Sequence, residues 1–487
     1  MSTINTNIPS LVSQRGLRRS QFDLGQSLQR LSTGLKINRG ADDPAGLIVS
    51  ERLRSEIAAS QQAIRNSQRA INVIATTEGA LDEVSALLSD IQAKLVEAAN
   101  TGAFSDEERD ANQLQIDSAI DSIARIANTT TFAGRKLLDG GLDYVTSGVD
   151  TTMLADVSVL GASFGTRDFI PVEVEVSTSA QKAQLTFPAS AISTAGGVTI
   201  DVQGVDGIIT LSFPASASTV DIIDAINAEQ DATGVTASAA AYVVGSGPPP
   251  VASGVVIQSI GYGSKEFVSI TEVGDPTGRF NVFDRDGQDV DRTEGVDAVG
   301  TINGAPTIGD GLDLKLSSSL LKLEVTIDES FGANQTTFAI TAGGALFQLG
   351  PQVNTNLQEN IGVKSMQPNK LGNRLVGFLS DLRSGQRFDL RSGNFKQGSD
   401  VVNEVITQVS VLRGRLGAFE RNTLQTNINQ LEITNENLIS SESVIRDTDF
   451  AIETSNLTRS QILVQAGNSV LAIANAQAQN VLTLLGG

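Results

Sequence analysis

The sequence predicts an α+β protein with a discontinuous helical, coiled-coil core built from both termini and a central β-rich outer domain. Proline is nearly confined to the centre, because only Pro9 and Pro44 of the 12 prolines fall within residues 1–140 and none falls within 399–487. Glycine divides in the same way, with 9 in the first segment, 5 in the last and 32 between them. Apolar residues recur every seven positions at both ends but alternate with polar residues in the centre. These are the periods of paired helices and of half-buried strands.

The composition excludes most catalytic chemistry. The 487 residues include no Cys and no His. Disulfides, thiolate or imidazole metal ligands and a Ser-His-Asp relay are therefore impossible. The sequence contains no nucleotide-binding, serine-hydrolase or zinc-protease fingerprint, so we predict no enzyme activity, no cofactor and no metal. The 55 Asp and Glu residues exceed the 35 Lys and Arg residues, and the net charge of −20 argues against nucleic-acid binding.

Targeting signals are also lacking in the sequence. The first thirty residues carry polar or charged residues every few positions, so they have no apolar stretch of the kind found in a cleavable signal peptide. No segment approaches the roughly 18 apolar residues that cross a membrane. Taken alone, these features predict a cytoplasmic protein without membrane insertion.

The N-terminal arm is predicted to contain three helices. Leucines at 4/3/4 spacing place one stripe on the first helix. Asp42-Asp43-Pro44 interrupts it, and Pro44 suits the first turn of a second helix, whose repeat stops at Gly102. Ser105 and Glu108 have the spacing of a capping box that opens the third helix. The first stripe is Leu24, Leu28, Leu31 and Leu35, the second repeat is Ile57, Ile64, Ile71, Ile74, Leu81, Val84, Leu88, Ile91 and Leu95, and the third helix turns Ile116, Ile120 and Ile123 inward.

The C-terminal arm has a similar pattern. Its apolar residues step 3/4/3/4/3 over residues 402–419 and then recur every seven residues from 424 to 445. Such a repeat keeps one seam facing a partner helix in a coiled coil, although the core of an ordinary bundle is an alternative. Because both ends carry repeats, the simplest closure packs the N-terminal helices against the C-terminal ones. The seam is Val402, Val405, Val409, Leu412, Leu416, Phe419, Leu424, Leu431, Leu438 and Ile445, and a last segment carries Leu463, Ala466, Val470, Ile473 and Leu484.

Short strands and turns are predicted in the centre. Residues 172–176 and 198–202 alternate apolar and polar side chains, as half-buried strands do. The segment Leu185–Ser190 recurs as Leu211–Ser216, which we interpret as a local, hairpin-like duplication. Residues 245–250 form a predicted loop because they are all Gly, Ser or Pro.

One short helix is predicted within the centre, from Ser218 to Asn227. Ser218 and Asp221 have capping-box spacing. Ile223 and Ile226 would share its buried face.

The densest carboxylate cluster lies at residues 284–291 and could collect Ca²⁺. Its spacing does not match an EF-hand, because a Gly at loop position six would put Val282 at the first ligand position. A solvated Asp-Gly hairpin turn is the interpretation that we favour. The cluster comprises Asp284, Asp286, Gly287, Asp289 and Asp291.

Two other kinds of site have less support. Paired carboxylates could converge for glycoside hydrolysis, but no motif singles out a pair. Arg15, Arg18 and Arg19 are too few for a nucleic-acid patch, and we interpret them as a solvated helix face.

Several short motifs follow one another in order at the two ends of the chain. At the N-terminus these are Ile4–Asn7, Leu28–Asn38, Ala41–Gly46, Gln62–Asn66 and Thr77–Leu81. At the C-terminus they are Ile445–Ala451, Gln461–Leu463, Gln465–Gly467, Asn480–Leu482 and Leu484–Leu485. With these motifs the chain resembles bacterial flagellin, the filament subunit of the flagellum, over residues 1–140 and 399–487.

The resemblance implies a domain organisation. Residues 1–45 plus 451–487 would form an inner helical polymerisation domain that lines the central channel of the filament. Residues 46–170 plus 347–450 would form a coiled-coil shell with a strand-rich part, and residues 171–346 would form a surface-exposed outer domain. Family subunits leave the cell unfolded through the flagellar export apparatus and assemble at the filament tip. The missing signal peptide would then agree with secretion to an extracellular filament.

The terminal stripes cannot be buried within one subunit, so we expect the arms to be labile in the monomer and ordered by neighbours. A contact between two different faces, repeated with a non-closing rotation, gives a helical filament. The resemblance implies further copies of the chain, the export apparatus, an export chaperone, and cap and hook-associated proteins as partners. The polymerisation arms would use Leu24, Leu28, Leu31, Leu35, Leu463, Val470, Ile473 and Leu484, and the shell Ile64, Ile71, Leu81, Leu88, Leu95, Val409, Leu416, Leu431 and Leu438.

One departure from the family pattern bears on recognition by the vertebrate innate receptor. Flagellins that this receptor recognises carry an Arg and a Leu in the helix corresponding to residues 88–100, and a Glu in the following helix. The aligned positions here are Asp90, Lys94 and Gln115. A charge reversal, and a charged residue in an apolar pocket, should each weaken binding, so we expect poor receptor activation.

Alternative functions remain open at this point. A hook-filament junction protein shares the helical ends, although Ala41–Gly46 and the terminal Val481–Leu485 favour the filament subunit. The outer domain could act as an adhesive module or bear O-linked sugars on its Ser and Thr residues. An enzyme displayed on the filament is disfavoured, because a metalloprotease needs His.

Overall fold

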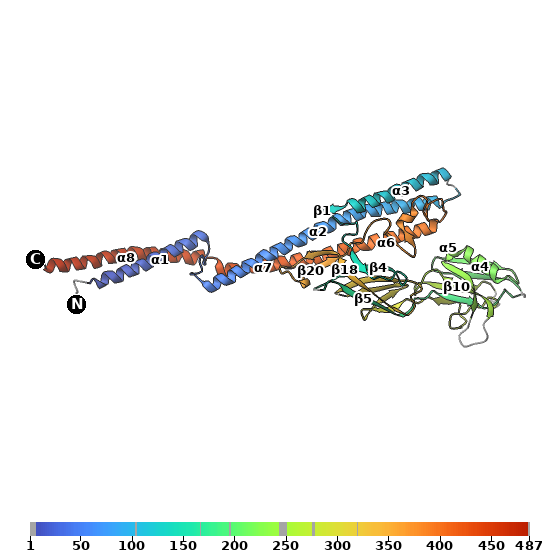
Figure 1. Ribbon diagram of the computed structural model, residues 1–487. Coiled ribbons are helices and arrows are strands. Elements are labelled where there is room, and N and C mark those ends of the chain that lie inside the picture. The colour runs from blue at the N-terminus through green and yellow to red at the C-terminus, as the bar shows by residue number, and fades with distance from the viewer. Residues whose placement is uncertain are drawn as a thin grey trace. The chain divides into compact units, whose positions relative to one another are not determined.

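The computed structural model describes residues 6–102, 105–165, 167–193, 196–242, 251–274, 278–318 and 320–485. Ile4 and Asn5 of the first motif and the predicted loop at 245–250 lie outside the described residues. The fold is of the predicted α+β class, with helices at both ends of the chain and strands in the centre (Figure 1). Within the described ranges, no helix combines the length and apolar character needed to cross a membrane.

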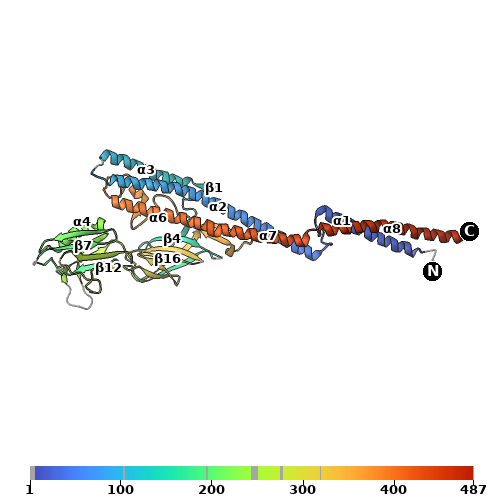
Figure 2. The ribbon, with the colours of Figure 1, turned by 180° about the vertical axis from the view of Figure 1, so that it is seen from behind.

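The chain divides into two units, of which the first is mainly helical. It comprises residues 1–69, 348–357 and 422–487. Helices α1 (Ile8–Thr33) and α8 (Phe450–Leu485) lie side by side within it and run in opposite directions, in both views (Figures 1 and 2). We call this pair the terminal hairpin.

The ends of α1 follow from local sequence. The side-chain oxygen of Asn7 accepts a hydrogen bond from the backbone N–H of Ser10, which caps the first turn. At the other end Gly34 adopts the left-handed conformation, with a φ of 73°, and its N–H bonds to Arg30 O. Leu35 therefore lies beyond the helix, so the prediction that it belongs to the α1 stripe is wrong. The helix stops where a glycine closes its last turn, before the predicted interruption at Asp42.

Helix α2 (Pro44–Ala98) begins at the predicted Pro44, and its first part packs against α7 (Thr426–Arg446) within the first unit. Ser60 Oγ donates a hydrogen bond to Leu431 O over 3.4 Å, and Asn427 Nδ2 donates one to Ser67 Oγ over 3.1 Å. The buried α2 positions here are small, at Ser60, Ala63 and Ser67. Small side chains let two helix backbones approach closely, which turns the neighbouring Ile64 to the half-buried flank.

The second unit comprises residues 70–347 and 358–421. Its helical part places the rest of α2 beside α3 (Asp106–Thr129) and α6 (Phe395–Phe419) (Figures 1 and 2). The capping box predicted at Ser105 and Glu108 is present. Of the predicted shell residues, Leu81, Leu88, Leu95, Val409, Leu416 and Leu431 are buried, whereas Ile64, Ile71 and Leu438 are only half-buried.

A π-helical turn, Glu420–Gln425, joins α6 to α7. The spacing from Leu416 to Leu424 is eight residues instead of the seven of a heptad, yet both side chains are buried. A π-turn accommodates one extra residue, and it therefore keeps both leucines on the buried side.

Two antiparallel sheets enclose the first β core of the second unit. Their strand orders are β14-β13-β5-β18-β3 and β15-β16-β17-β4. Valines of β5 alternate inward, at Val172, Val174 and Val176. The strands are β3 (Tyr144–Ser147), β4 (Leu154–Ala162), β5 (Ile170–Thr178), β13 (Val299–Ile302), β14 (Ala305–Pro306), β15 (Ile308–Asp310), β16 (Asp313–Ser317), β17 (Leu321–Ile327) and β18 (Gln335–Gly343).

A second β core lies between the sheets β6-β10-β9 and β12-β11-β7-β8. The Phe187 and Phe280 rings stack inside it with centroids 4.2 Å apart. Helix α4 (Thr219–Ala228) covers β9, followed by the short α5 (Gln230–Thr233). The strands are β6 (Gln184–Phe187), β7 (Val198–Gln203), β8 (Ile208–Phe213), β9 (Val235–Tyr242), β10 (Val251–Ser259), β11 (Phe267–Glu272) and β12 (Arg292–Glu294).

Some predictions for the centre need correction. The capping box of α4 is present at Ser218 and Asp221, but Ile222 is buried beside Ile226, and Ile223 is only half-buried. The duplicated segments do not form a hairpin, because β6 pairs with β10 and β8 pairs with β7. Sequence similarity between two strands fixes their side-chain alternation but not their pairing partners.

The predicted outer domain, residues 171–346, encloses the second β core completely and the first only in part. Residue 171 falls inside β5, and the first core also includes Tyr144 and Leu154. The remaining short elements are β1 (Thr131–Phe132), β2 (Arg135–Lys136), β19 (Ala345–Gln348), β20 (Gln358–Ile361), β21 (Gly372–Asn373), β22 (Gly377–Phe378) and the 3₁₀ turns Thr355–Leu357 and Leu379–Leu382.

We predict that Ala63→Leu destabilises the α2–α7 pair. Ala63 is only 1% exposed, so the three added carbons of a leucine would force the helices apart, at a cost of about 1–3 kcal/mol. Ala58→Leu is the matched control, because Ala58 lies exposed on the same helix. Chemical denaturation of the full chain, followed by circular dichroism, would measure the difference. Equal midpoints for the two variants would contradict the assignment of Ala63 to the seam.

Candidate assembly interface

Small residues close the terminal hairpin. Ser10 Oγ bonds to Asn475 Oδ1 over 2.8 Å, and Asn7 Nδ2 donates to Ala474 O over 3.0 Å. A Cβ added at Gly467 would lie 3.3 Å from Leu17 Cδ1, so α8 approaches α1 closely at a residue without a side chain. Buried or half-buried residues follow 3/4 spacing along both helices, at Ser10, Ser13, Leu17, Ser20, Leu24, Ser27 and Leu31 on α1 and at Glu453, Leu457, Ser460, Val464, Gly467, Leu471 and Ala474 on α8.

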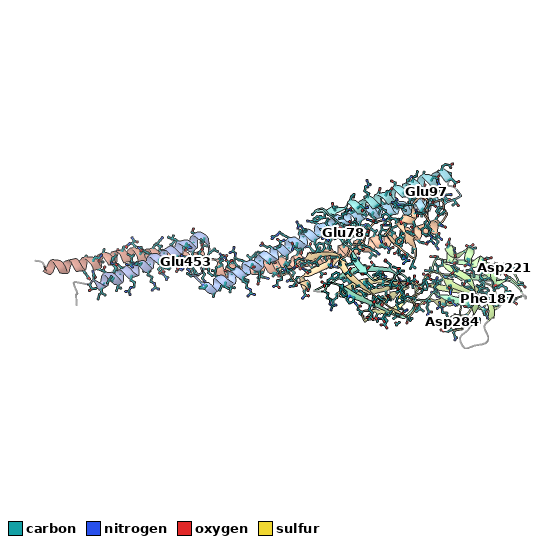
Figure 3. All side chains as sticks on the ribbon, in the orientation of Figure 1. Glu78, Glu97, Phe187, Asp221, Asp284 and Glu453 are labelled. Carbon is teal, nitrogen blue, oxygen red and sulfur yellow. The ribbon has the colours of Figure 1, made fainter. Side chains whose placement is uncertain are left out.

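One ion pair crosses the seam near the start of α8. Arg30 and Glu453 approach to 3.6 Å, and Glu453 is only 6% exposed (Figure 3). Arg30 Nε has no hydrogen-bond partner in this structure. Removing the carboxylate would thus leave a largely buried guanidinium without its counter-charge.

A second set of large apolar side chains in the hairpin is exposed and lies outside the seam. On α1, Ile8 and Phe22 are 59% and 65% exposed, and on α8 Ile462 and Ile473 are 60% and 61% exposed. Exposed apolar residues that gather on one element mark surfaces for other molecules, whereas singly scattered ones need no explanation. The exposed apolar residues are Ile8, Leu11, Val12, Phe22 and Leu28 on α1 and Phe450, Ile452, Ile462, Leu463, Val470 and Ile473 on α8.

The residues predicted for the polymerisation arms divide between seam and surface. Leu24 and Leu31 are half-buried in the seam, whereas Leu28 is exposed. On α8 the predicted Leu463, Val470 and Ile473 are all exposed, and the side chain of Leu484 lies outside the described residues. The sequence reasoning missed the serines, alanine and glycine of the seam. Their 3/4 spacing was visible, but only large apolar residues were counted.

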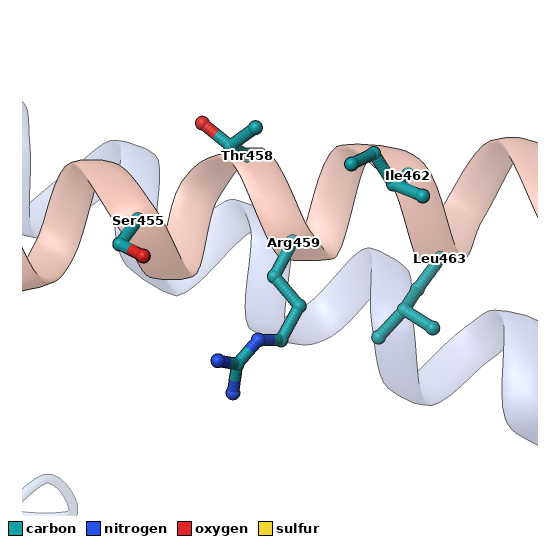
Figure 4. Close-up of a pocket in the computed structure, with 5 residues that line it drawn as sticks. All are labelled: Ser455, Thr458, Arg459, Ile462 and Leu463. Carbon is teal, nitrogen blue, oxygen red and sulfur yellow. The ribbon is translucent and has the colours of Figure 1, made fainter.

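An open pocket of about 460 Å³ lies on the outer side of α8. All five of its lining residues belong to this one helix, with the Arg459 guanidinium beside apolar side chains (Figure 4). A hollow on a single helix suits a side chain of another protein better than a small ligand, which needs an enclosing site. Its lining is Ser455, Thr458, Arg459, Ile462 and Leu463.

The positions aligned with the innate-receptor site lie on α2 and α3. Asp90 and Gln115 are exposed. The Lys94 ammonium pairs with Glu97 over 2.8 Å, and this hydrogen bond holds the pKa of the Glu97 carboxyl below its usual value (Figure 3). Asp90 thus presents a negative charge to solvent, Gln115 an uncharged amide, and the half-buried Lys94 is paired with Glu97.

The acidic cluster forms a tight turn, as predicted. Asp284 Oδ1 accepts hydrogen bonds from the N–H groups of Asp286 and Gln288, over 2.9 and 2.8 Å (Figure 3). Gly287 has a φ of 78°, and Phe283 bridges to Asp289 across the turn. Within the described part of the chain, no group of three or more acidic residues is placed to hold a metal ion.

Comparison with known proteins gives matches over the whole chain. A model of the bacterial flagellin N-terminal helical region matches residues 4–142, one of the C-terminal helical region matches 399–485, and one of the flagellin hook IN motif matches 197–244. A flagellin of Salmonella rubislaw is 30% identical over 99% of both chains, and a B-type flagellin of Pseudomonas aeruginosa is 29% identical over 99% of both. The solved FliC structure from Burkholderia pseudomallei is 13% identical, covers 74% of this chain and 99% of its own, and gives a TM-score of only 0.24.

We predict that Glu453→Ala loosens the terminal hairpin. The change removes the counter-charge of Arg30, and the unpaired buried group should cost about 1–3 kcal/mol. Hydrogen exchange of α1 and α8 amides in the full chain would show faster exchange. Asp23→Ala is the control, because Asp23 is an exposed carboxylate on the same hairpin. Equal protection of the two variants would mean that the ion pair does not hold the helices together.

Proposed function

The chain belongs to the bacterial flagellin family and is a structural subunit of the flagellar filament, and we propose that its terminal hairpin is the part that polymerises. The observation that carries the proposal is the division of side chains in the hairpin. Small residues alternate with half-buried leucines and a valine in the seam, and a second set of large apolar residues is exposed on both helices. Only another molecule can bury them.

The two outer faces support a head-to-tail contact. Their residues differ, so the α1 face of one copy can meet the α8 face of the next in a contact between unlike surfaces. A contact between unlike faces leaves one of each free at every addition, and it therefore extends into a helical polymer.

We further propose the domain roles that the family pattern implies. Residues 1–45 plus 451–487 form the inner polymerisation domain, and residues 46–170 plus 347–450 form the shell. Residues 171–346 form the outer domain on the filament surface. The large buried residues of the shell support this division, because they allow the shell to fold without neighbours.

The proposed partners follow from the same role. Further copies of the chain are the principal partner, and the export apparatus, an export chaperone, the cap and hook-associated proteins act during secretion and assembly at the tip. The destination is the extracellular filament, with no membrane insertion, no nucleic acid and no catalysis in the proposed role. The junction-protein alternative has no better support, because both curated relatives named above are flagellins over 99% of this chain.

We predict that removing either end of the hairpin abolishes polymerisation but not folding. Chains lacking residues 1–40 or 455–487 should keep the circular dichroism signals of the strands and of the shell helices. They should fail to elongate seeds of the intact protein, as measured by sedimentation and electron microscopy. Truncated chains that still form filaments would overturn the assignment of the hairpin.

A milder set of variants tests the same prediction without deletions. Leu463→Ser combined with Ile473→Ser should slow seeded elongation, because it removes apolar area that a neighbour would bury. Ile308→Ser is the control, since Ile308 is 74% exposed on β15, far along the chain from the hairpin. Equal elongation by both would show that apolar exposure on α8 serves no contact between copies.

We also predict weak activation of the vertebrate innate receptor. Asp90, Lys94 and Gln115 replace the Arg, Leu and Glu of recognised family members. Purified monomer applied to reporter cells should give a weaker response than an enteric flagellin, and Asp90→Arg with Lys94→Leu and Gln115→Glu should raise it. A wild-type response as strong as that of the enteric protein would contradict this.

A further inference from the structure

The terminal hairpin differs in charge from the rest of the protein. The whole chain carries a net charge of −20, but the described hairpin residues, 6–33 and 450–485, include five arginines and only two carboxylates. Arg30 is paired with Glu453 across the seam. The hairpin is therefore a cationic segment of an acidic protein.

Three of these arginines form one exposed face of α1, which we call the cationic face. Arg15, Arg18 and Arg19 are exposed, and none of them makes an ion pair within the described part of the chain. Together with Ile8, Leu11, Val12 and Phe22 they step by three and four residues along the side opposite the seam. The arginines occupy the middle of this stripe, between Val12 and Phe22.

A complementary face lies on α7 of the same unit, which we call the acidic face. Glu432 and Glu436 are exposed, four residues apart, and no ion pair forms on either within the described ranges. Ile433, between them, is 57% exposed, and Val444, eight residues beyond Glu436 on the same helix, is 82% exposed. The buried Ile428 precedes Glu432 by four residues, so the acidic face borders the side of α7 that packs on α2 and lies exposed at its flank.

We propose that the cationic face of one copy docks on the acidic face of a second copy, in the polymer whose formation is the proposed function. Both faces set charges three to four residues apart on a helix that also exposes apolar side chains, so opposite charges and apolar surface can meet together. Two cationic faces cannot pair with each other, because Asp23 is the only acid among residues 8–33. The contact joins unlike faces, so each copy uses both and growth continues.

A lipid surface fits the cationic face less well. A helix that lies on a membrane places its apolar residues in a continuous strip with cations along the edges. On α1 the arginines stand in the centre of the strip, so insertion of Val12 and Phe22 would bury them.

Charge reversal tests the contact in the full-length protein. One variant carries Arg15→Glu, Arg18→Glu and Arg19→Glu, a second carries Glu432→Lys and Glu436→Lys, and a third combines all five changes. Spontaneous polymerisation without wild-type seeds, measured by sedimentation at low salt, should fall about tenfold for the first and second variants, because like charges then oppose each other. The third variant, and an equimolar mixture of the first two, should recover most of the wild-type yield.

Control variants show whether a variant has lost the contact between copies or has lost its fold. Lys265→Glu, Arg292→Glu and Lys322→Glu make the same change in net charge in the β-rich region and should polymerise normally. Helix content by circular dichroism should match wild type in every variant. If the combined variant keeps its helices but does not recover, or if the first variant polymerises normally, the docking is wrong.

The remaining outcomes identify what has failed. A further test measures binding of the monomer to anionic phospholipid vesicles. If wild-type monomer binds, and the three arginine reversals abolish this binding without affecting polymerisation, the cationic face is assigned to lipid and the proposal is overturned. If the hairpin truncations block polymerisation but charge reversals do not, only this contact is refuted. If the truncated chains polymerise, the proposed function itself fails.

Discussion

Close packing of the chain's two ends through small side chains is the constraint on which the rest of the assembly surface depends. Ser10, Ser27, Ser460, Gly467 and Ala474 bring α1 and α8 together but remove little apolar area from water. A buried Leu or Ile contributes about 1.5–3 kcal/mol, and the hairpin leaves residues of this kind outside. A seam of this composition gives the hairpin a defined shape but modest stability. A neighbour that covers the outer faces therefore supplies a large part of the folding free energy of the hairpin.

The same contrast in the size of the buried side chains occurs along α2, within the proposed shell. Along α2 the buried positions change from Ser60, Ala63 and Ser67 to Leu81, Leu88 and Leu95. The second group buries large side chains against the subunit's own helices and needs no neighbour. Independent shell folding together with a hairpin that gains from assembly is the combination expected of a subunit that is stable alone and still polymerises.

Local signals in the sequence are sufficient to predict where helices and turns begin and end. They do not predict which elements pair over long distances in the sequence. Pro44, the capping boxes at Ser105 and Ser218, and the turn at Gly287 depend on residues a few positions apart, so their chemistry is visible in the sequence. The predicted seam of α2 lies one residue away from the observed one. The heptad pattern places Ile64 in the seam, whereas the structure buries Ala63 there. Hydrophobic periodicity identifies large residues as buried, but here the closest contact selects small ones and leaves large ones half-buried or exposed. Strand partners such as β6 with β10 are separated by tens of residues, so no local pattern reveals them.

Charge and apolar exposure identify the same segment for independent reasons. Copies that each carry a net charge of −20 repel one another, and this self-repulsion opposes assembly as much as it favours solubility. Screening at physiological ionic strength limits that repulsion to a range of about 8 Å, so the charges nearest the contact decide whether two copies can meet. The hairpin has an excess of arginine over carboxylate, and its outer faces hold exposed apolar side chains. A subunit that is acidic as a whole can then be soluble as a monomer, and its cationic, apolar stripe can still attract another copy.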